Sequence, residues 1–177
     1  MTASCWSIRH ALTSDTPAIL HIEQACPEAP HWSEASWREV LANKENQQPA
    51  RAAFVAEDPT GVLGFAVATC TKDLSELETV AVSPPARRQG IGQALIQAAA
   101  EWSRKRGAMS MELEVRASSH GAQSLYRSLG FVEQGIRRGY YRDPSEDAVL
   151  MAANLQNDAL LALPGGPVRR IVPDAKV

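Results

Sequence analysis

The stretch Arg87-Arg88-Gln89-Gly90-Ile91-Gly92 decides how this chain is organised. It follows the apolar run Val80-Ala81-Val82 and precedes a helical pattern, so it marks a turn from a strand into a helix. Its glycines let the backbone turn tightly without side chains in the way. The first N–H groups of a helix have no partner within the helix and lie at the positive end of its dipole. With two arginines beside them, these groups predict a binding site for a pyrophosphate.

Two other nucleotide-binding motifs do not fit this stretch. A dinucleotide fingerprint needs a small residue three positions after Gly92, where the chain has Leu95. A P-loop needs Gly-Lys-Ser or Gly-Lys-Thr, and the chain contains neither. A glycine-containing strand-to-helix turn that binds no ligand is the simplest alternative at this point.

Composition and charge narrow the class of protein. The 177 residues are 45% hydrophobic, which fits one domain with a substantial core, and the net charge of −2 gives no reason to expect nucleic-acid binding. The three widely spaced cysteines and the four histidines show no metal-ligand spacing, so we expect reduced thiols, no metal and a cytoplasmic location. The N-terminal residues lack a basic region followed by an apolar core, so we expect no signal peptide, and because no apolar run approaches about 18 residues we expect no membrane association.

Periodicity predicts a mixed α/β sheet with helices on both faces. The strands are predicted at residues 6–12, 52–56, 62–69, 77–82, 109–115, 131–135 and 147–154. Helices are predicted at residues 15–25 with Ser14 as the cap, from Ser33 onward, at 90–106, and in a short segment that Ser118 or Ser119 caps and Gly130 ends. We expect residues 1–155 to form one domain and residues 156–177, which lack apolar periodicity, to form a mobile tail.

The segment from Met109 to Arg116 has two different faces. Met111, Leu113 and Val115 share one face, and Glu112, Glu114 and Arg116 share the other. Such a strand lies either at a solvated edge of the sheet or beside a cavity. Because it follows the glycine-opened helix, the right-handed crossover predicts that it pairs with residues 77–82 in mid-sheet, which favours the cavity.

The chain resembles the GNAT acetyltransferases. Arg87, Gly90 and Gly92 match the three defined positions of their acetyl-coenzyme A signature, [Q/R]-x-x-G-x-[G/A], and the order of predicted elements resembles the GNAT fold across residues 6–155. In that fold two neighbouring central strands splay apart, and the pantetheine arm of acetyl-CoA lies in the gap.

Four further segments resemble the RimI-type branch, the protein N-terminal alanine acetyltransferases of bacterial ribosomes. They match, in order, the branch patterns PWSxxxF, LEVRxSN, LYxxxGF and RRxYY…EDAxxM, and they start at His31, Leu113, Leu125 and Arg137. The resemblance implies transfer of an acetyl group from acetyl-CoA to the N-terminal alanine of the eighteenth small-subunit ribosomal protein.

The resemblance also assigns roles to individual residues. Glu114 would be the proton acceptor and Tyr126 the proton donor, and Trp32, Tyr140 and Tyr141 would border the incoming peptide. The cofactor would contact Val80, Ala81, Val82, Arg87, Arg88, Gln89, Gly90, Ile91, Gly92, Gln93 and Ser119. Serine at 119 replaces the asparagine usual in the branch and cannot reproduce an amide contact, and His31 replaces a proline near the presumed substrate loop.

Other roles remain open for several of these residues. Tyr126 lies four residues after Ala122 and fits a core position, Trp32 fits a core anchor, and Tyr140 and Tyr141 fit hairpin packing. Arg137 and Arg138 are most simply a solvated face. The alternative functions are acetylation of internal lysines or of a small amine, and a noncatalytic acetyl-CoA-binding module that regulates a partner.

Overall fold

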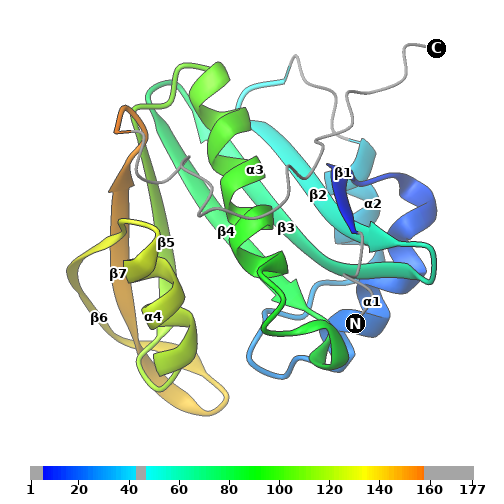
Figure 1. The fold of residues 1–177 in the computed structure, drawn as a ribbon. Helices are drawn as coiled ribbons and strands as arrows, with labels where there is room; N and C mark the ends of the chain where they lie inside the picture. The colour runs from blue at the N-terminus through cyan, green and yellow to red at the C-terminus, as the bar shows by residue number, and fades with distance from the viewer. Residues whose placement is uncertain (1–5, 43–46, 158–177) are drawn as a thin grey trace.

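Seven strands form one sheet with helices on both faces. The computed structural model describes residues 6–42 and 47–157. The strands are β1 (Ser7–His10), β2 (Ala50–Asp58), β3 (Gly61–Thr71), β4 (Leu74–Val82), β5 (Ser110–Arg116), β6 (Val132–Arg142) and β7 (Ser145–Asn154). The helices are η1 (Thr13–Asp15), α1 (Thr16–Gln24), α2 (Glu34–Ala42), η2 (Pro84–Ala86), α3 (Ile91–Lys105) and α4 (His120–Ser128). This arrangement confirms the predicted mixed α/β sheet (Figure 1).

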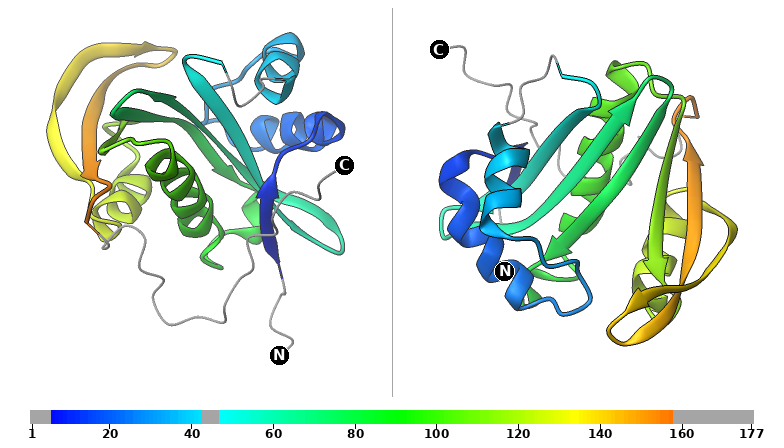
Figure 2. Two further views of the ribbon diagram at one scale, coloured as in Figure 1. Left: turned by 90° about the horizontal axis from the view of Figure 1, so that it is seen from above. Right: turned by 180° about the vertical axis from the view of Figure 1, so that it is seen from behind.

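The two central strands separate along their length. The sheet order is β1-β2-β3-β4-β5-β7-β6, and β4–β5 is a parallel pair with α3 as its crossover. Pairing between β4 and β5 covers Leu74–Ser110 to Glu76–Glu112 and stops there. Beyond it the two strands diverge, which Figure 2 shows clearly from behind. This splay was expected from the resemblance, and it leaves the β5-facing edge of Val80–Val82 without strand pairing while β3 pairs with the other edge.

Two hydrophobic cores lie on opposite faces of the sheet. Leu95, Ile96 and other apolar residues of α3 pack with Met111 and Leu113 of β5 on one face, which α4 also covers. On the other face Ile19 of α1 and Trp37 of α2 pack against the central strands. In the view from above, β6 and β7 curve toward the side that α1 and α2 occupy (Figure 2). The α3 and α1/α2 faces therefore present different side chains to the gap between β4 and β5.

A bulge in β4 changes which residues face which core. The register with β3 shifts between Leu77–Ala68 and Thr79–Val67, so Glu78 is the extra residue. Leu77 lies in the α3 core, whereas Val67 and Ala81 lie in the α1/α2 core. Glu78 and Thr79 therefore both lie on the α1/α2 face, the face on which β5 presents Glu112 and Glu114.

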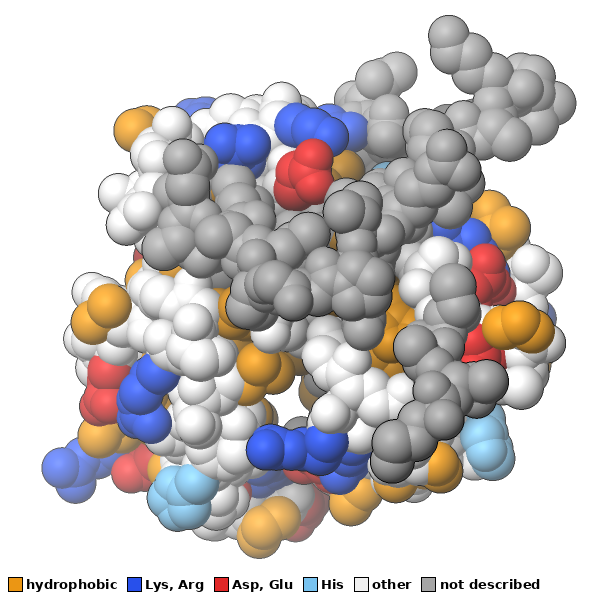
Figure 3. Space-filling model, in the orientation of Figure 1, with side chains coloured by type: hydrophobic (Ala, Val, Ile, Leu, Met, Phe, Trp, Pro, Cys, Tyr) orange, Lys and Arg blue, Asp and Glu red, His pale blue; other side chains and the backbone are white. Residues whose placement is uncertain are grey.

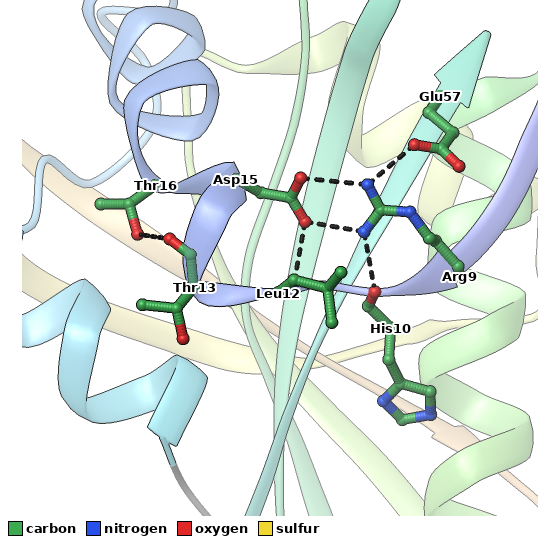
Figure 4. A network of polar contacts seen from close by, with 7 residues as sticks. All are labelled: Arg9, His10, Leu12, Thr13, Asp15, Thr16 and Glu57. Carbon is green, nitrogen blue, oxygen red and sulfur yellow. Dashed lines mark hydrogen bonds and ion pairs between the residues drawn. The ribbon is translucent and has the colours of Figure 1, made fainter. Parts of the chain in front are cut away.

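An ion-pair network anchors the first strand. The Arg9 guanidinium on β1 donates to both carboxylate oxygens of Asp15, at 2.7 and 3.0 Å, and to Glu57 of β2 at 2.7 Å (Figure 4). Asp15 Oδ2 also accepts the Leu12 N–H at 2.7 Å. These contacts fix the turn that leads from β1 into α1.

Most predicted elements are confirmed, with three differences. The strand predicted at 131–135 is β6, and it continues to Arg142, because its partner β7 reaches Ser145. The predicted cap Ser14 lies inside η1, and Asp15 precedes α1 instead. Leu155 is fully buried and Gln156 donates a hydrogen bond to the Ala108 carbonyl at 3.4 Å, so Gln156, predicted to start the tail, contacts the domain. Residues 158–177 of that tail, and Cys5, lie outside the described residues.

Within the described ranges, every helix is too short or too polar to cross a membrane. Cys26 and Cys70 are both buried and form no disulfide.

Candidate active site

The site lies where β4 and β5 have separated and where α3 and α4 begin. Figure 3 shows a hollow between α4 and the start of α3, with Lys or Arg side chains along its rim. The backbone of Val80–Val82 borders this region from β4, and Ser119, the residue before α4, borders it at the end of β5. The predicted cofactor residues therefore gather around one opening of the sheet.

The glycine-rich turn has the geometry of an anion cradle. Gly90 is the N-cap of α3 with φ 78°, in the left-handed region that glycine tolerates best, and Arg88 also has a positive φ of 64°. The Ala94 N–H is bonded to the Gly90 carbonyl at 3.1 Å, so the N–H groups of residues 91–93 precede the first helical hydrogen bond. Successive N–H groups in such a turn form a concave site for an anion.

The two arginines of this turn differ in their surroundings. Arg87 donates to Glu28 at 2.7 Å, to the Val82 carbonyl at 3.1 Å and to the Cys26 sulfur at 3.3 Å. Its side chain ties the turn to the loop after α1 and is not directed at a free anion. Arg88 is exposed and has no ion pair within the described ranges. Of the two predicted cofactor-binding arginines, Arg88 is the one with an available guanidinium.

Glu114 lies at the centre of a cluster on the α1/α2 face. Its Oε1 pairs with Arg137 Nη1 at 2.7 Å, and its Oε2 accepts the Tyr140 hydroxyl at 3.1 Å. The Tyr141 hydroxyl reaches the Glu114 carbonyl at 3.5 Å, and the two tyrosine rings meet edge to face at 5.1 Å. The predicted base and the predicted substrate-binding tyrosines are thus neighbours, although they are far apart in the sequence.

Sequence reasoning missed the part that Arg137 plays here. Arg137 is exposed, as predicted for a solvated face, but its guanidinium also pairs with Glu114 and lies 5.1 Å from the centre of the Tyr140 ring. The sequence signal for this role was the position of Arg137 in the RRxYY segment, three residues before Tyr140. In the structure this segment belongs to β6, and both side chains contact Glu114 of β5. Burial raises the pKa of Tyr140, and its hydrogen bond to Glu114 raises it further, so this phenol stays protonated and donates to the carboxylate.

A second group of polar and charged side chains stabilises the loop between β5 and α4. Arg116 pairs with Glu146 at 3.2 Å and lies 4.1 Å from the centre of the Tyr141 ring. The other carboxylate oxygen of Glu146 accepts the Ser118 N–H at 2.5 Å. Gln123 donates to the Arg116 and Ala117 carbonyls at 3.1 and 2.9 Å. These contacts hold Ser119 and the start of α4 in place beside the splay.

Tyr126 lies on the other side of the sheet. It is buried in the α3 core, 8% exposed, with its ring 5.7 Å from that of Phe131. Burial strongly raises the pKa of its phenol, so Tyr126 holds its proton at neutral pH. Glu114 and Tyr126 therefore lie on opposite faces of the sheet.

Trp32 packs with residues of the α1/α2 side of the sheet. Its ring packs 5.0 Å from that of Trp37, and Arg51 stacks 5.0 Å above it. Arg51 also pairs with Glu78 of the bulge. This is the core-anchor environment that was the alternative for Trp32, and its substrate role stays a prediction.

Comparison with known proteins agrees with this geometry. A profile of the Acetyltransferase (GNAT) family matches residues 16–131. The chain belongs to the GNAT acetyltransferase family. The "[Ribosomal protein bS18]-alanine N-acetyltransferase" of Escherichia coli (strain K12) is 39% identical to this GNAT chain over 142 residues, which cover 79% of this chain and 91% of the relative. A Bacillus subtilis (strain 168) protein named as a putative enzyme of the same kind is 30% identical over 145 residues, 82% and 93% of the two chains.

A solved structure extends the likeness to three dimensions. The crystal structure of the ribosomal-protein-S18-alanine N-acetyltransferase from Escherichia coli matches this GNAT chain with a TM-score of 0.71 and 34% identity. The match covers 92% of this chain and 98% of that one. The resemblance to the RimI-type branch is thereby confirmed.

Proposed function

We propose that this chain is an acetyl-CoA-dependent Nα-acetyltransferase that acetylates the N-terminal alanine of small-subunit ribosomal protein bS18. The observation that carries the proposal is the position of Glu114, hydrogen-bonded to Tyr140 and flanked by Tyr141, beside the gap between β4 and β5. The names of the E. coli and B. subtilis relatives supply the substrate. This function places the protein in the cytoplasm, where ribosomal proteins are made.

Several features of the structure support acetyl-CoA as the acetyl donor. The N–H groups of residues 91–93 and the Arg88 guanidinium would hold the pyrophosphate, and Gln89 and Gly90 would shape the turn. The unpaired edge of Val80–Val82 would hydrogen-bond the pantetheine arm, and Ser119 would border it. Acetyl-CoA supplies an acyl group on a good thiolate leaving group, and the chain supplies binding and proton transfer.

We assign the two proton transfers of the reaction to opposite faces of the sheet. The peptide amine would approach from the α1/α2 face, where Glu114 accepts its proton directly or through a water molecule. The thiolate would depart toward the α3/α4 face, where the protonated Tyr126 donates to sulfur. A backbone N–H of the splayed β4 edge would stabilise the charge that develops on the acetyl oxygen.

A peptide panel tests the proposal. The full chain is incubated with acetyl-CoA and peptides that begin with Ala, Ser or Met, and with an N-terminally blocked peptide that carries an internal lysine. Tandem mass spectrometry then gives the mass gain and its position. We expect acetylation at the α-amine of the Ala peptide. Acetylation of the lysine or of a small amine would favour the alternative GNAT activities, and acetyl-CoA binding without turnover would favour a noncatalytic module.

A further inference from the structure

Thr79 carries a buried hydroxyl without a partner. Its residue is 5% exposed, and its Oγ1 has no hydrogen-bond partner within the described ranges. Thr69, on the neighbouring strand β3, differs, since its hydroxyl donates to Glu78. Burying an unsatisfied hydroxyl costs free energy, and native proteins keep few such groups. A ligand that donates a hydrogen bond to Thr79 Oγ1 would satisfy this group.

The bulge in β4 places Thr79 on the face of the sheet that carries Glu114. Because Glu78 is the extra residue, Thr79 lies on the α1/α2 face, the same face as Glu112 and Glu114 of β5. Thr79 lies past the last β4–β5 pair, Glu76–Glu112, where the strands have separated. It also directly precedes Val80–Val82, the edge assigned to acetyl-CoA. Thr79 and Glu114 thus flank the same gap, one on each strand.

The α-amine of the peptide can donate to two hydrogen-bond acceptors at this gap, the Glu114 carboxylate and the Thr79 hydroxyl. A peptide α-ammonium group has three N–H bonds. Transfer of one proton to Glu114 creates the lone pair that attacks the acetyl carbon, and two N–H bonds remain. A fixed acceptor for one of these two N–H bonds would orient the amine so that its lone pair faces the acetyl carbon. Such orientation of the reacting groups contributes substantially to the rate enhancement of an enzyme.

We infer that the Thr79 hydroxyl accepts a hydrogen bond from the incoming α-amine and orients it for attack. The inference rests on the proposed function, because it takes the substrate to be an amine that enters from the α1/α2 face. Thr79 is then a substrate-positioning residue that acts together with Glu114. Its hydroxyl remains unsatisfied in the free enzyme because its partner arrives with the substrate.

Two substitutions at the same position separate this role from packing. Thr79→Val keeps the shape and removes the hydroxyl, and Thr79→Ser keeps the hydroxyl and removes a methyl group. We expect Thr79→Val to lower kcat/KM for the Ala peptide by about 10- to 100-fold, the effect of one hydrogen bond to a charged group. The KM for acetyl-CoA should stay unchanged, and the Tm should not fall. Thr79→Ser should keep activity within about threefold of wild type, and Thr71→Val, at the far end of β3, is the matched control.

Each other outcome overturns the inference. A Thr79→Val variant with normal kcat/KM shows that the hydroxyl does not touch the substrate. A variant that is unfolded or has a lowered Tm shows a structural partner for the hydroxyl. Failure of Thr79→Ser to retain activity shows that packing of the methyl group matters instead. A wild-type protein that acetylates no amine overturns the proposed function, whereas a normal Thr79→Val variant beside an active wild type overturns only the role of Thr79.

Discussion

At the scale of single residues, Glu114 has the most demanding role. Both of its carboxylate oxygens have partners from β6, Arg137 and Tyr140, and each oxygen retains a lone pair for a substrate N–H or a water molecule. The β6 side chains therefore orient the carboxylate without blocking it.

Glu114→Gln should lower kcat by about 10²- to 10⁴-fold, because the shape is kept and the proton acceptor is lost. Steady-state kinetics should show an unchanged KM for acetyl-CoA. Glu112→Gln is the matched control, since Glu112 lies two residues earlier on the same face of β5. Full activity in Glu114→Gln would refute its role, and a loss confined to Glu112→Gln would move the base to Glu112.

Tyr126 tests whether a core residue also performs chemistry. Because burial raises its pKa, the phenol keeps its proton to a higher pH than an exposed tyrosine, whose pKa is about 10. Tyr126→Phe should lower kcat by about 10²-fold or more, while its ring keeps the contact with Phe131 and the Tm stays near that of wild type. Normal kcat with a lowered Tm would make Tyr126 a core residue alone. Turnover and thermal melting of one variant decide between the two roles.

At the scale of elements, the start of α3 shapes the cofactor site. A Cβ on Gly92 would lie 3.5 Å from Leu125 of α4 and 3.7 Å from Val82 of β4, which are ordinary contacts. The fold therefore has room for alanine at this position, and a larger side chain would extend into the space between α3, α4 and β4.

Gly92→Val should raise the KM for acetyl-CoA well above that of Gly92→Ala, because its branched side chain obstructs the approach of the pyrophosphate to the backbone N–H groups. Thermal melting should show that both variants fold. Gly135→Ala on β6, with Leu150 at 3.8 Å from the added Cβ, is the control glycine substitution. An unchanged KM in Gly92→Val would place the pyrophosphate elsewhere.

The β1–η1 turn depends on charge, and its stability should vary with pH. Burial raises the pKa of Asp15, but hydrogen bonds from Arg9 and the Leu12 N–H outweigh it, so the pKa is lower in the folded state. The ionised network therefore stabilises the fold above the unfolded pKa of about 4, and this contribution is lost as pH falls through the folded pKa.

Arg9→Gln should lower the free energy of unfolding at pH 7 by about 1–3 kcal/mol, because it leaves the Asp15 carboxylate buried without its main donor. Urea unfolding at pH 7 and at pH 3 measures the effect. The difference between Arg9→Gln and wild type should shrink at pH 3. A difference that is the same at both pH values would show that the network contributes through packing rather than charge.

At the scale of the whole molecule, ligand binding should be coupled to folding. The gap between β4 and β5 and the turn before α3 exist only when the sheet is assembled, so acetyl-CoA can bind the folded state alone. Acetyl-CoA at 100 times its Kd should stabilise the protein by about 2.7 kcal/mol, which raises the Tm by roughly 5–10 °C. Acetyl-pantetheine, which lacks the pyrophosphate, should stabilise it less. A Tm that responds to ATP or NADH but not to acetyl-CoA would refute the cofactor assignment.

The sequence by itself determined the features that depend on local order. The glycines of residues 90 and 92, the apolar stripe of α3 and the alternation of Met111–Arg116 predicted the turn, the helix and the two faces of β5, because backbone freedom and periodicity are properties of short segments. The resemblance then identified Glu114, Tyr126, Tyr140 and Tyr141 as candidates for one site.

Only the tertiary structure decided which of these residues meet. The extension of β6 to Arg142 depends on pairing with β7, and it brings Arg137 and Tyr140 onto Glu114 from 23 and 26 residues away. The bulge at Glu78 depends on register with β3, and it turns Thr79 toward the face of Glu114. Arg87, matched to the cofactor motif, is held by Glu28 across 59 residues. Strand register and long-range charge pairing are set by the assembled sheet, so no local pattern in the sequence could specify them.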